Sequence, residues 1–197
     1  MRLKQPFLKI TIAAALTSTV GMGAVISSLS FLPVSHAAAA SITVTEAASE
    51  QALKTLNSFY KPALKGQFPG SVSGLTVGKS TRKDVSKLIG EPYNKGDNSD
   101  AFDIYHAEMG NPGYAFSFRL DKIREMRYFG TNVERGTNIG GITMRMLRKN
   151  WYAPESTTTI KNGKTKQTKI TYLRGQYKLE FIFNSSTELD HINLMHS

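Results

Sequence analysis

The sequence predicts an α+β protein in which helices pack on antiparallel β-meanders, arranged as two related helix-plus-sheet units in tandem. Two nine-residue segments, 77–85 and 139–147, align with a constant offset of 62 residues. Each carries a helix-start signal and is followed by short runs in which apolar and polar residues alternate, as in strands with one buried face. Short segments that contain Gly, Asn or Pro separate these runs, and segments of this kind form the turns of β-hairpins. Since a duplicated unit dictates architecture, the repeat is the strongest guide to the fold.

The first 38 residues have the composition of an export signal. Three positive residues precede an uncharged, largely apolar run over 10–34, and small residues follow at 35–37. This order is typical of a secretory signal that is cleaved, so we expect a secreted, possibly cell-wall-associated protein. The alternative is an uncleaved membrane anchor, because the run is long enough to span a bilayer. After cleavage we expect no stable membrane span.

Charge and cysteine content restrict the partners. The chain contains no cysteine, which excludes disulfides, thiolate metal sites and the lipid-anchored exported class. Of the formal net charge of +10, three positive charges belong to the leader, which has no acids, so the remainder carries +7. Such an excess favours anionic wall polymers or lipid headgroups for an exported protein, and we expect no nucleic-acid partner. A basic surface that only aids solubility is the alternative.

Three segments follow the predicted signal over 1–38. Residues 39–74 form an N-terminal helix and loop, with a helix from Thr45 to Leu64 that Pro62 distorts or ends. The first helix-plus-sheet repeat spans 75–135, and the second, diverged repeat spans 136–197.

Each repeat opens with a helix. In the first, Ser80 or Thr81 is placed to cap the helix, Asp84 completes a capping box, and Gly90 ends it. The second keeps the capping Thr143 but has no glycine at its end, so we expect a less well terminated helix.

Strands are predicted at 102–107, 114–120, 123–129, 157–160, 166–173, 177–184 and 189–195. One face of each strand is apolar and should bury against the helices, which leaves a polar face exposed. Joined side by side, the polar faces of the two halves would form one broad, mildly basic surface.

A family resemblance rests on the pattern Gly78-x-x-Thr81-x-x-x-Val85-x-x-x-Ile89-Gly90-x-Pro92. This pattern, followed by a strand meander, resembles the secreted beta-lactamase-inhibitor-protein fold and the related small outer-membrane assembly lipoproteins. The resemblance implies tandem repeats of helices over a four-stranded sheet, with a concave sheet surface that docks proteins. The inhibitors carry disulfides within their repeats, whereas this chain has no cysteine.

A closer similarity extends from Leu53 to the C-terminus. On the segments 56–60, 66–70 and 89–93, the chain is similar to the YjgB-type exported proteins of Bacillus-like bacteria, a family of unknown function. The shared motifs are structural, so they bear on the fold more than on the function.

Catalytic and metal-binding patterns are incomplete, so we expect no enzyme activity, no cofactor and no metal site. The segment 74–80 has three residues between its glycines where a phosphate-binding loop needs four. Asp97, Asp100 and Asp103 lack the ligand spacing of a calcium loop, which favours a solvated turn. The histidines at 106, 191 and 196 are predicted to be unpaired surface residues.

We therefore expect an exported, non-catalytic binding or inhibitory module that docks a protein or a cell-wall component on its open sheet. Arg119, Arg127 and Lys178 would attract the partner, and Glu125 and Glu180 would select its orientation. Tyr105 would add contact area, since Phe102 and Ile104 are expected to point inward. The alternative is a cell-envelope structural protein that anionic wall polymers retain electrostatically.

Overall fold

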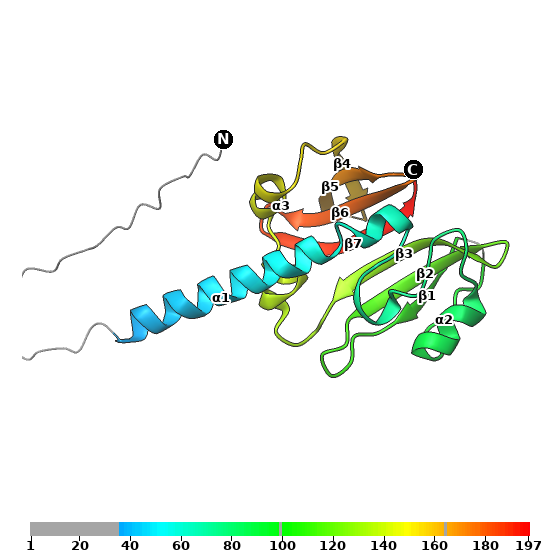
Figure 1. The fold of residues 1–197 in the computed structure, drawn as a ribbon, viewed down its shortest axis with the longest axis horizontal. Helices are drawn as coiled ribbons and strands as arrows, with labels where there is room; N and C mark the ends of the chain where they lie inside the picture. Colours follow the sequence, from blue (N-terminus) through cyan, green and yellow to red (C-terminus); the bar gives the residue numbers. More distant parts are fainter. Residues whose placement is uncertain (1–35, 99, 164) are drawn as a thin grey trace, which may run out of the picture. The chain divides into compact units, whose positions relative to one another are not determined.

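The computed structural model describes residues 36–98, 100–163 and 165–197, and the predicted signal over 1–38 lies almost entirely outside them. Within these residues, three α-helices accompany a seven-stranded antiparallel sheet (Figure 1). The helices are α1 (His36–Ser58), α2 (Arg82–Ile89) and α3 (Met144–Asn150). The strands are β1 (Phe102–Tyr105), β2 (Gly113–Arg119), β3 (Lys122–Gly130), β4 (Ser156–Asn162), β5 (Thr165–Arg174), β6 (Tyr177–Ser185) and β7 (Glu188–His196). The α+β class and the seven predicted strands are confirmed.

The strands form one open sheet in the order β1-β2-β3-β7-β6-β5-β4. Each meander ends on a central strand, and these two strands, β3 and β7, pair antiparallel to one another. Strands from the two parts of the chain thereby share one hydrogen-bonded ladder. The finer assignment, two related repeats with the inhibitor-protein fold, stays a prediction.

The N-terminal helix differs from its predicted bounds. α1 begins at His36 and ends at Ser58, and the chain continues as a separate 3-10 turn, Pro62–Lys65. Proline lacks the backbone N–H that would continue the helix, so it starts a new turn instead. Gly66 ends that turn with φ of 70°, a left-handed conformation that glycine adopts without steric cost. No described helix is long and apolar enough to cross a bilayer.

The two shorter helices begin where the sequence indicates. Thr81 Oγ1 accepts a hydrogen bond from Asp84 N at 3.1 Å, and Asp84 Oδ2 accepts one from Thr81 N at 2.8 Å, which makes a capping box. The hydrogen bonds that Asp84 Oδ2 accepts from the backbone N–H and the hydroxyl of Thr81 lower the pKa of Asp84. In α3, Thr143 Oγ1 accepts from Met146 N at 3.0 Å, and the helix ends at Asn150 without a glycine cap.

The hydrophobic core lies on one side of the sheet, which we call the covered face. The Phe59 ring, which follows α1, lies 5.0 Å from the ring of Tyr128. The Arg82 guanidinium at the start of α2 lies 4.4 Å from the ring of Phe118. Trp151, at the end of α3, meets Phe181 at 5.3 Å. Helices from both parts of the chain therefore cover the same face, and the opposite face carries the polar residues.

Candidate functional site on the open face

We call the uncovered side of the sheet the open face and define it by the residues whose strand positions alternate with the core. They include Ser117, Glu125, Arg127, Lys169, Thr171, Lys178, Glu180, Ile182, His191 and Asn193. Four of the six predicted binding residues belong to this set. The prediction that strand alternation would place them on one surface is thus confirmed in position, while their role in binding stays a prediction.

The strand register arranges these residues in rows. Arg127 on β3 lies opposite Asn193 on β7, which lies opposite Glu180 on β6. In the next row, Glu125 lies opposite Met195, which lies opposite Lys178. Directly opposed side chains in an antiparallel sheet are within contact distance, so each row acts as one strip of surface.

Ion pairs join the charged residues of the open face. Arg127 Nε lies 2.8 Å from Glu125 Oε1. On the other side of β7, Glu180 Oε1 receives Lys169 Nζ at 3.3 Å and Lys178 Nζ at 3.5 Å. These pairs join three cations to two carboxylates. The surface therefore presents fixed, alternating charges and only a small net positive charge.

Three polar side chains on the open face are buried although no described helix packs there. Ser117 is fully buried, Asn193 is 5% exposed and Glu180 is 6% exposed. Longer side chains contact two of them: Arg124 Nε donates to Ser117 Oγ at 3.2 Å, and Lys169 and Lys178 both reach Glu180. The guanidinium of Arg127 also lies 4.0 Å from the ring of Phe102. The outer layer is therefore supported from below and presents a preorganised surface.

Two β-bulges bring extra side chains to this face. On β3, the bulge inserts Arg124 between the residues that pair with Ser117 and Phe118. On β7, the bulge inserts Asp190 between the residues that pair with Ile182 and Phe183. Consecutive side chains of a strand normally point to opposite faces. A bulged residue interrupts this alternation, so two residues that are adjacent in sequence can both lie on the same face.

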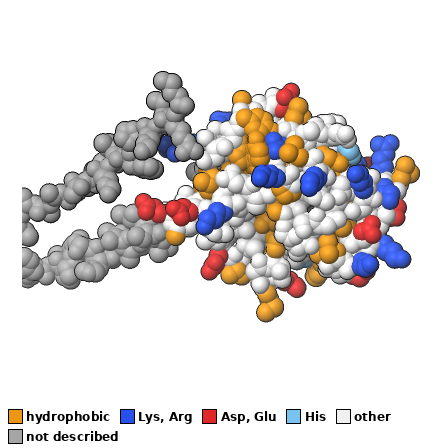
Figure 2. All heavy atoms as spheres, viewed as in Figure 1, with side chains coloured by type: hydrophobic (Ala, Val, Ile, Leu, Met, Phe, Trp, Pro, Cys, Tyr) orange, Lys and Arg blue, Asp and Glu red, His pale blue; other side chains and the backbone are white. Residues whose placement is uncertain are grey.

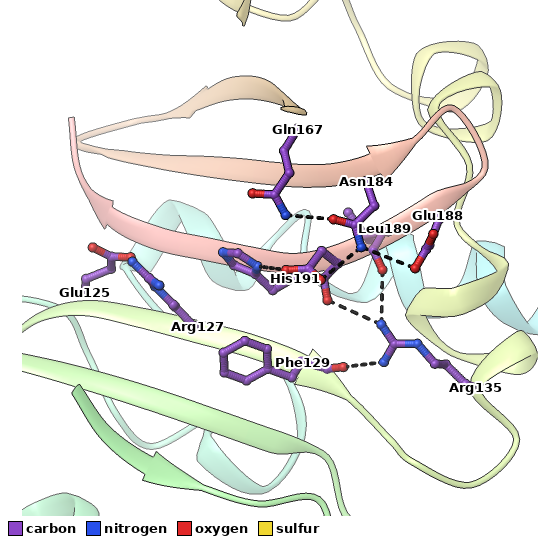
Figure 3. Close-up of polar contacts among 10 residues, drawn as sticks. Glu125, Arg127, Phe129, Arg135, Gln167, Asn184, Glu188, Leu189 and His191 are labelled. Atoms are coloured by element: carbon purple, nitrogen blue, oxygen red, sulfur yellow. Dashed lines mark hydrogen bonds and ion pairs between the residues drawn. The ribbon is translucent and has the colours of Figure 1, made fainter. Parts of the chain in front are cut away.

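Figure 3 shows the polar network around the second bulge. His191 Nδ1 lies 2.6 Å from Asp190 Oδ2, and the Asn184 amide donates to Asp190 and to Glu188, each at 3.2 Å. Arg135 ties the loop after β3 to this strand by donating to the carbonyl oxygens of residues 129, 189 and 190. The hydrogen bond with His191 is the main cause that lowers the pKa of Asp190.

The histidine prediction is corrected at position 191. His191 is 9% exposed, paired with Asp190, and lies 5.5 Å from the ring of Phe129. His106 and His196 are exposed, but each contacts a tyrosine ring, Tyr93 at 4.4 Å and Tyr177 at 4.8 Å. The bulge that brings Asp190 beside His191 left no signal in the sequence.

The predicted exposure of Tyr105 is wrong. It lies opposite Tyr114 on the covered face and is 8% exposed. Phe102 and Ile104 belong to the open face instead, because Phe102 lies opposite Ser117 and supports Arg127. With four residues, β1 offers too few alternations to fix its orientation from sequence.

Arg119 lies at the end of β2, where it is exposed. It shares with Glu125 a hollow of about 600 Å³ that also includes Met195. Five of the six predicted residues thus lie on the open face or at its rim.

The acidic segment between α2 and β1 is also corrected. Asp103 is 1% exposed, is ion-paired with Arg82, and accepts a hydrogen bond from Gly96 N at 2.8 Å. Asp100 is paired with Arg124 at 2.7 Å. The prediction of a solvated turn is therefore wrong for Asp103, whereas Asp97 and Asp100 are exposed as predicted. Across the described ranges, no group of three or more His, Cys, Asp or Glu is placed to hold a metal ion.

Comparison with known proteins gives one family and one closely similar structure. The family model described as "Domain of unknown function (DUF4309)" matches residues 56–195. The uncharacterized protein YjgB of Bacillus subtilis (strain 168) is 38% identical over 194 residues, which is 98% of each chain. The crystal structure of YjgB from Bacillus subtilis superposes with a TM-score of 0.68 at 38% identity, covering 75% of this chain and 99% of that one.

A more distant structure is an extracellular protein containing an SCP domain from Bacillus anthracis. It is 14% identical, has a TM-score of 0.45, and covers 65% of this chain and 46% of its own. Similarity at this level carries no argument about function.

Proposed function

This chain belongs to the DUF4309 family, and we propose that it is an exported, non-catalytic module that docks a protein partner on the open face of its sheet. The observation that carries the proposal is the ion-pair arrangement on that face. Diffuse attraction of a polyanion needs an excess of unpaired cations, whereas here Arg127 and Lys178 are each held against a carboxylate. Alternating fixed charges instead favour a partner with complementary charges in one orientation.

The composition of the face supports a protein partner. Arg127 and Phe102 form a partly exposed stacked pair, and aromatic and arginine side chains are enriched where protein interfaces gain most of their energy. In this arrangement Arg127 and Lys178 attract the partner, and Glu125 and Glu180 select its orientation. Arg119 lies at the rim, where charges mainly affect the association rate. Tyr105 has no part, because it lies on the covered face.

The finer prediction of two repeats is retained as part of this proposal. The bulges at Arg124 and Asp190 lie 66 residues apart, close to the 62-residue offset of the helix segments, and each follows a phenylalanine-containing strand in the same register. Tandem duplication accounts for both similarities. It also explains why the two central strands, β3 and β7, pair antiparallel and join two polar surfaces into one.

The test is binding of the purified protein to the extracellular and envelope fractions of the bacterium that makes it. Arg127→Ala should reduce binding at least about fivefold, because central interface residues contribute about 1 kcal/mol or more. Lys87→Ala on α2 is the matched control, since it removes one positive charge from a different side of the molecule.

Electrostatic retention by wall polymers predicts a different result. Figure 2 shows Lys and Arg side chains spread across the visible surface, so a polyanion would contact many of them weakly. Equal losses in Arg127→Ala and Lys87→Ala, with complete release by salt, would overturn docking on the open face in favour of this alternative. Export is tested separately, by sequencing the N-terminus of the secreted protein, which should begin near residue 39.

A further inference from the structure

A second hollow lies away from the open face, at the outer edge of the sheet. It has a volume of about 440 Å³ and lies between the end of α2, strand β1 and the turn that precedes β2. Its walls include Glu91, Tyr93, Tyr105, His106, Glu108 and Tyr114. Because Tyr105 and Tyr114 belong to the covered face, we call this hollow the edge cleft and treat it as distinct from the docking surface.

The charge of the edge cleft is opposite to that of the protein. Two carboxylates, Glu91 and Glu108, line it, and no lysine or arginine does. Within the part of the chain that the structure describes, neither carboxylate makes an ion pair, although the chain carries a net charge of +10. A cleft with this lining attracts cations and repels anions.

The aromatic walls suit a cation that carries N–H groups. Tyr93 is 76% exposed, and its ring is held edge-to-face at 4.4 Å from the ring of His106. The faces of tyrosine rings attract cations. The Tyr105 hydroxyl is buried and has no hydrogen-bond partner, a costly arrangement that a ligand donor would relieve.

The Tyr105 hydroxyl stays protonated, and therefore neutral, at neutral pH. Burial, with smaller effects from Asp103 and Glu91, raises the pKa of Tyr105 to about 12. Its oxygen can therefore accept a hydrogen bond at neutral pH without adding a charge of its own.

The chain contains a similar arrangement that is already filled by a cation. At the other end of the sheet, the guanidinium of Arg174 lies 3.7 Å from the ring of Tyr60 and 5.9 Å from that of Tyr152. It donates to Tyr60 O at 2.6 and 3.1 Å and is 6% exposed. Two residues before it, Tyr172 has a buried hydroxyl without a partner, as Tyr105 does. A tyrosine-lined site beside β5 of this sheet thus already accommodates a guanidinium.

We propose that the edge cleft binds an organic cation, a guanidinium or alkylammonium group, between Tyr93 and Tyr105 with Glu91 and Glu108 as counter-charges. The cation comes either from a side chain of an arginine- or lysine-containing peptide or from a free small amine. In both cases the ligand group must carry a positive charge, N–H donors and a flat or compact apolar surface that fits against the tyrosine rings.

The first experiment compares ligands that differ only in charge. N-acetyl-arginine amide and its neutral isostere N-acetyl-citrulline amide are titrated into the purified protein, with NMR shifts of the Tyr93 and His106 rings as the signal. The arginine compound should bind saturably and at least tenfold more tightly. Methylguanidine distinguishes the sources: equal affinity indicates that a free amine suffices, and weaker affinity indicates a peptide. Equal binding of arginine and citrulline compounds, or no binding of either, overturns the proposal.

The second experiment assigns the site. The double variant Glu91→Gln, Glu108→Gln should lose at least tenfold in affinity, while Glu134→Gln with Glu155→Gln, an equal loss of charge at exposed positions outside the cleft, should change it less than twofold. Tyr105→Phe should weaken binding several-fold yet leave the melting temperature unchanged or higher, because the hydroxyl has no partner to lose.

Retained affinity in the double variant would place binding elsewhere and refute the edge cleft. Arg127→Ala should leave arginine binding unchanged, so failure of the cleft and failure of docking on the open face are separable results.

Discussion

Replacing Asp103 with asparagine should destabilise the protein far more than the same change at a neighbouring aspartate. Asp103 is 1% exposed and holds two groups, the Arg82 guanidinium on α2 and the Gly96 backbone N–H. Hydrogen bonds to a charged group contribute about 1.5–3 kcal/mol each. Asparagine keeps the size but offers only neutral acceptors, so we expect a loss of about 2–3 kcal/mol. Half-exposed Arg82 can still reach water, which keeps the loss below that for a fully buried pair.

Asp100→Asn is the matched control, because Asp100 is also ion-paired with an arginine, Arg124, but its side chain is 82% exposed. Exposed pairs contribute about 0.5 kcal/mol or less. The assay is urea unfolding of the two variants beside the parent. If the dependence of the unfolding free energy on urea is the same for all three, a shift of the midpoint reports a change in stability. Equal losses in the two variants would refute the reasoning, since burial would then not decide the strength of the pair.

Two further predictions concern glycine geometry and acid stability. Gly66→Ala should cost about 2–3 kcal/mol, because φ is 70° and the added Cβ would lie 2.5 Å from the Tyr177 ring. Gly163→Ala, with φ of 59° but open space around it, should cost about 1 kcal/mol; urea midpoints that coincide would contradict the packing argument. Asp190 has a folded-state pKa below its ordinary value of 3.8, so its contribution to stability is present above that pH and is lost as pH falls through the lowered pKa. Asp190→Asn should therefore destabilise at pH 7 by more than at pH 3, and a pH-independent difference would show that folding does not lower this pKa.

The local elements were predictable because their signals are local. Thr81 with Asp84, and Thr143, mark helix starts by capping chemistry that involves residues three apart. Strand alternation placed Glu125, Arg127, Lys178 and Glu180 on one side, since side chains of a strand alternate strictly between bulges. The prediction that Pro62 distorts or ends the first helix is confirmed, because a separate 3-10 turn begins at this residue. The α-helix itself ends earlier, at Ser58, and that end depends on how the following loop packs.

The features that the sequence did not indicate depend on contacts between distant segments. Tyr105 was assigned to the wrong face, because apolar Phe102 supports Arg127 from another strand and so lies on the polar side. The pairing of His191 with Asp190 requires a bulge. A strand residue that bulges can be of the same type as one that pairs, so the sequence does not show where the register shifts.

By itself, the sequence determined the helices, the strands and the side to which most strand residues belong, because capping, turn formation and alternation act over a few residues. Only the tertiary structure decided that β3 and β7 pair at the centre of one sheet, which aligns Arg127, Asn193 and Glu180 in a single row. It also decided that cations of the open face pair with carboxylates and that two carboxylates without ion pairs line a separate cleft. Those outcomes depend on distances between side chains that are far apart along the chain, and such distances exist only after the strands have paired.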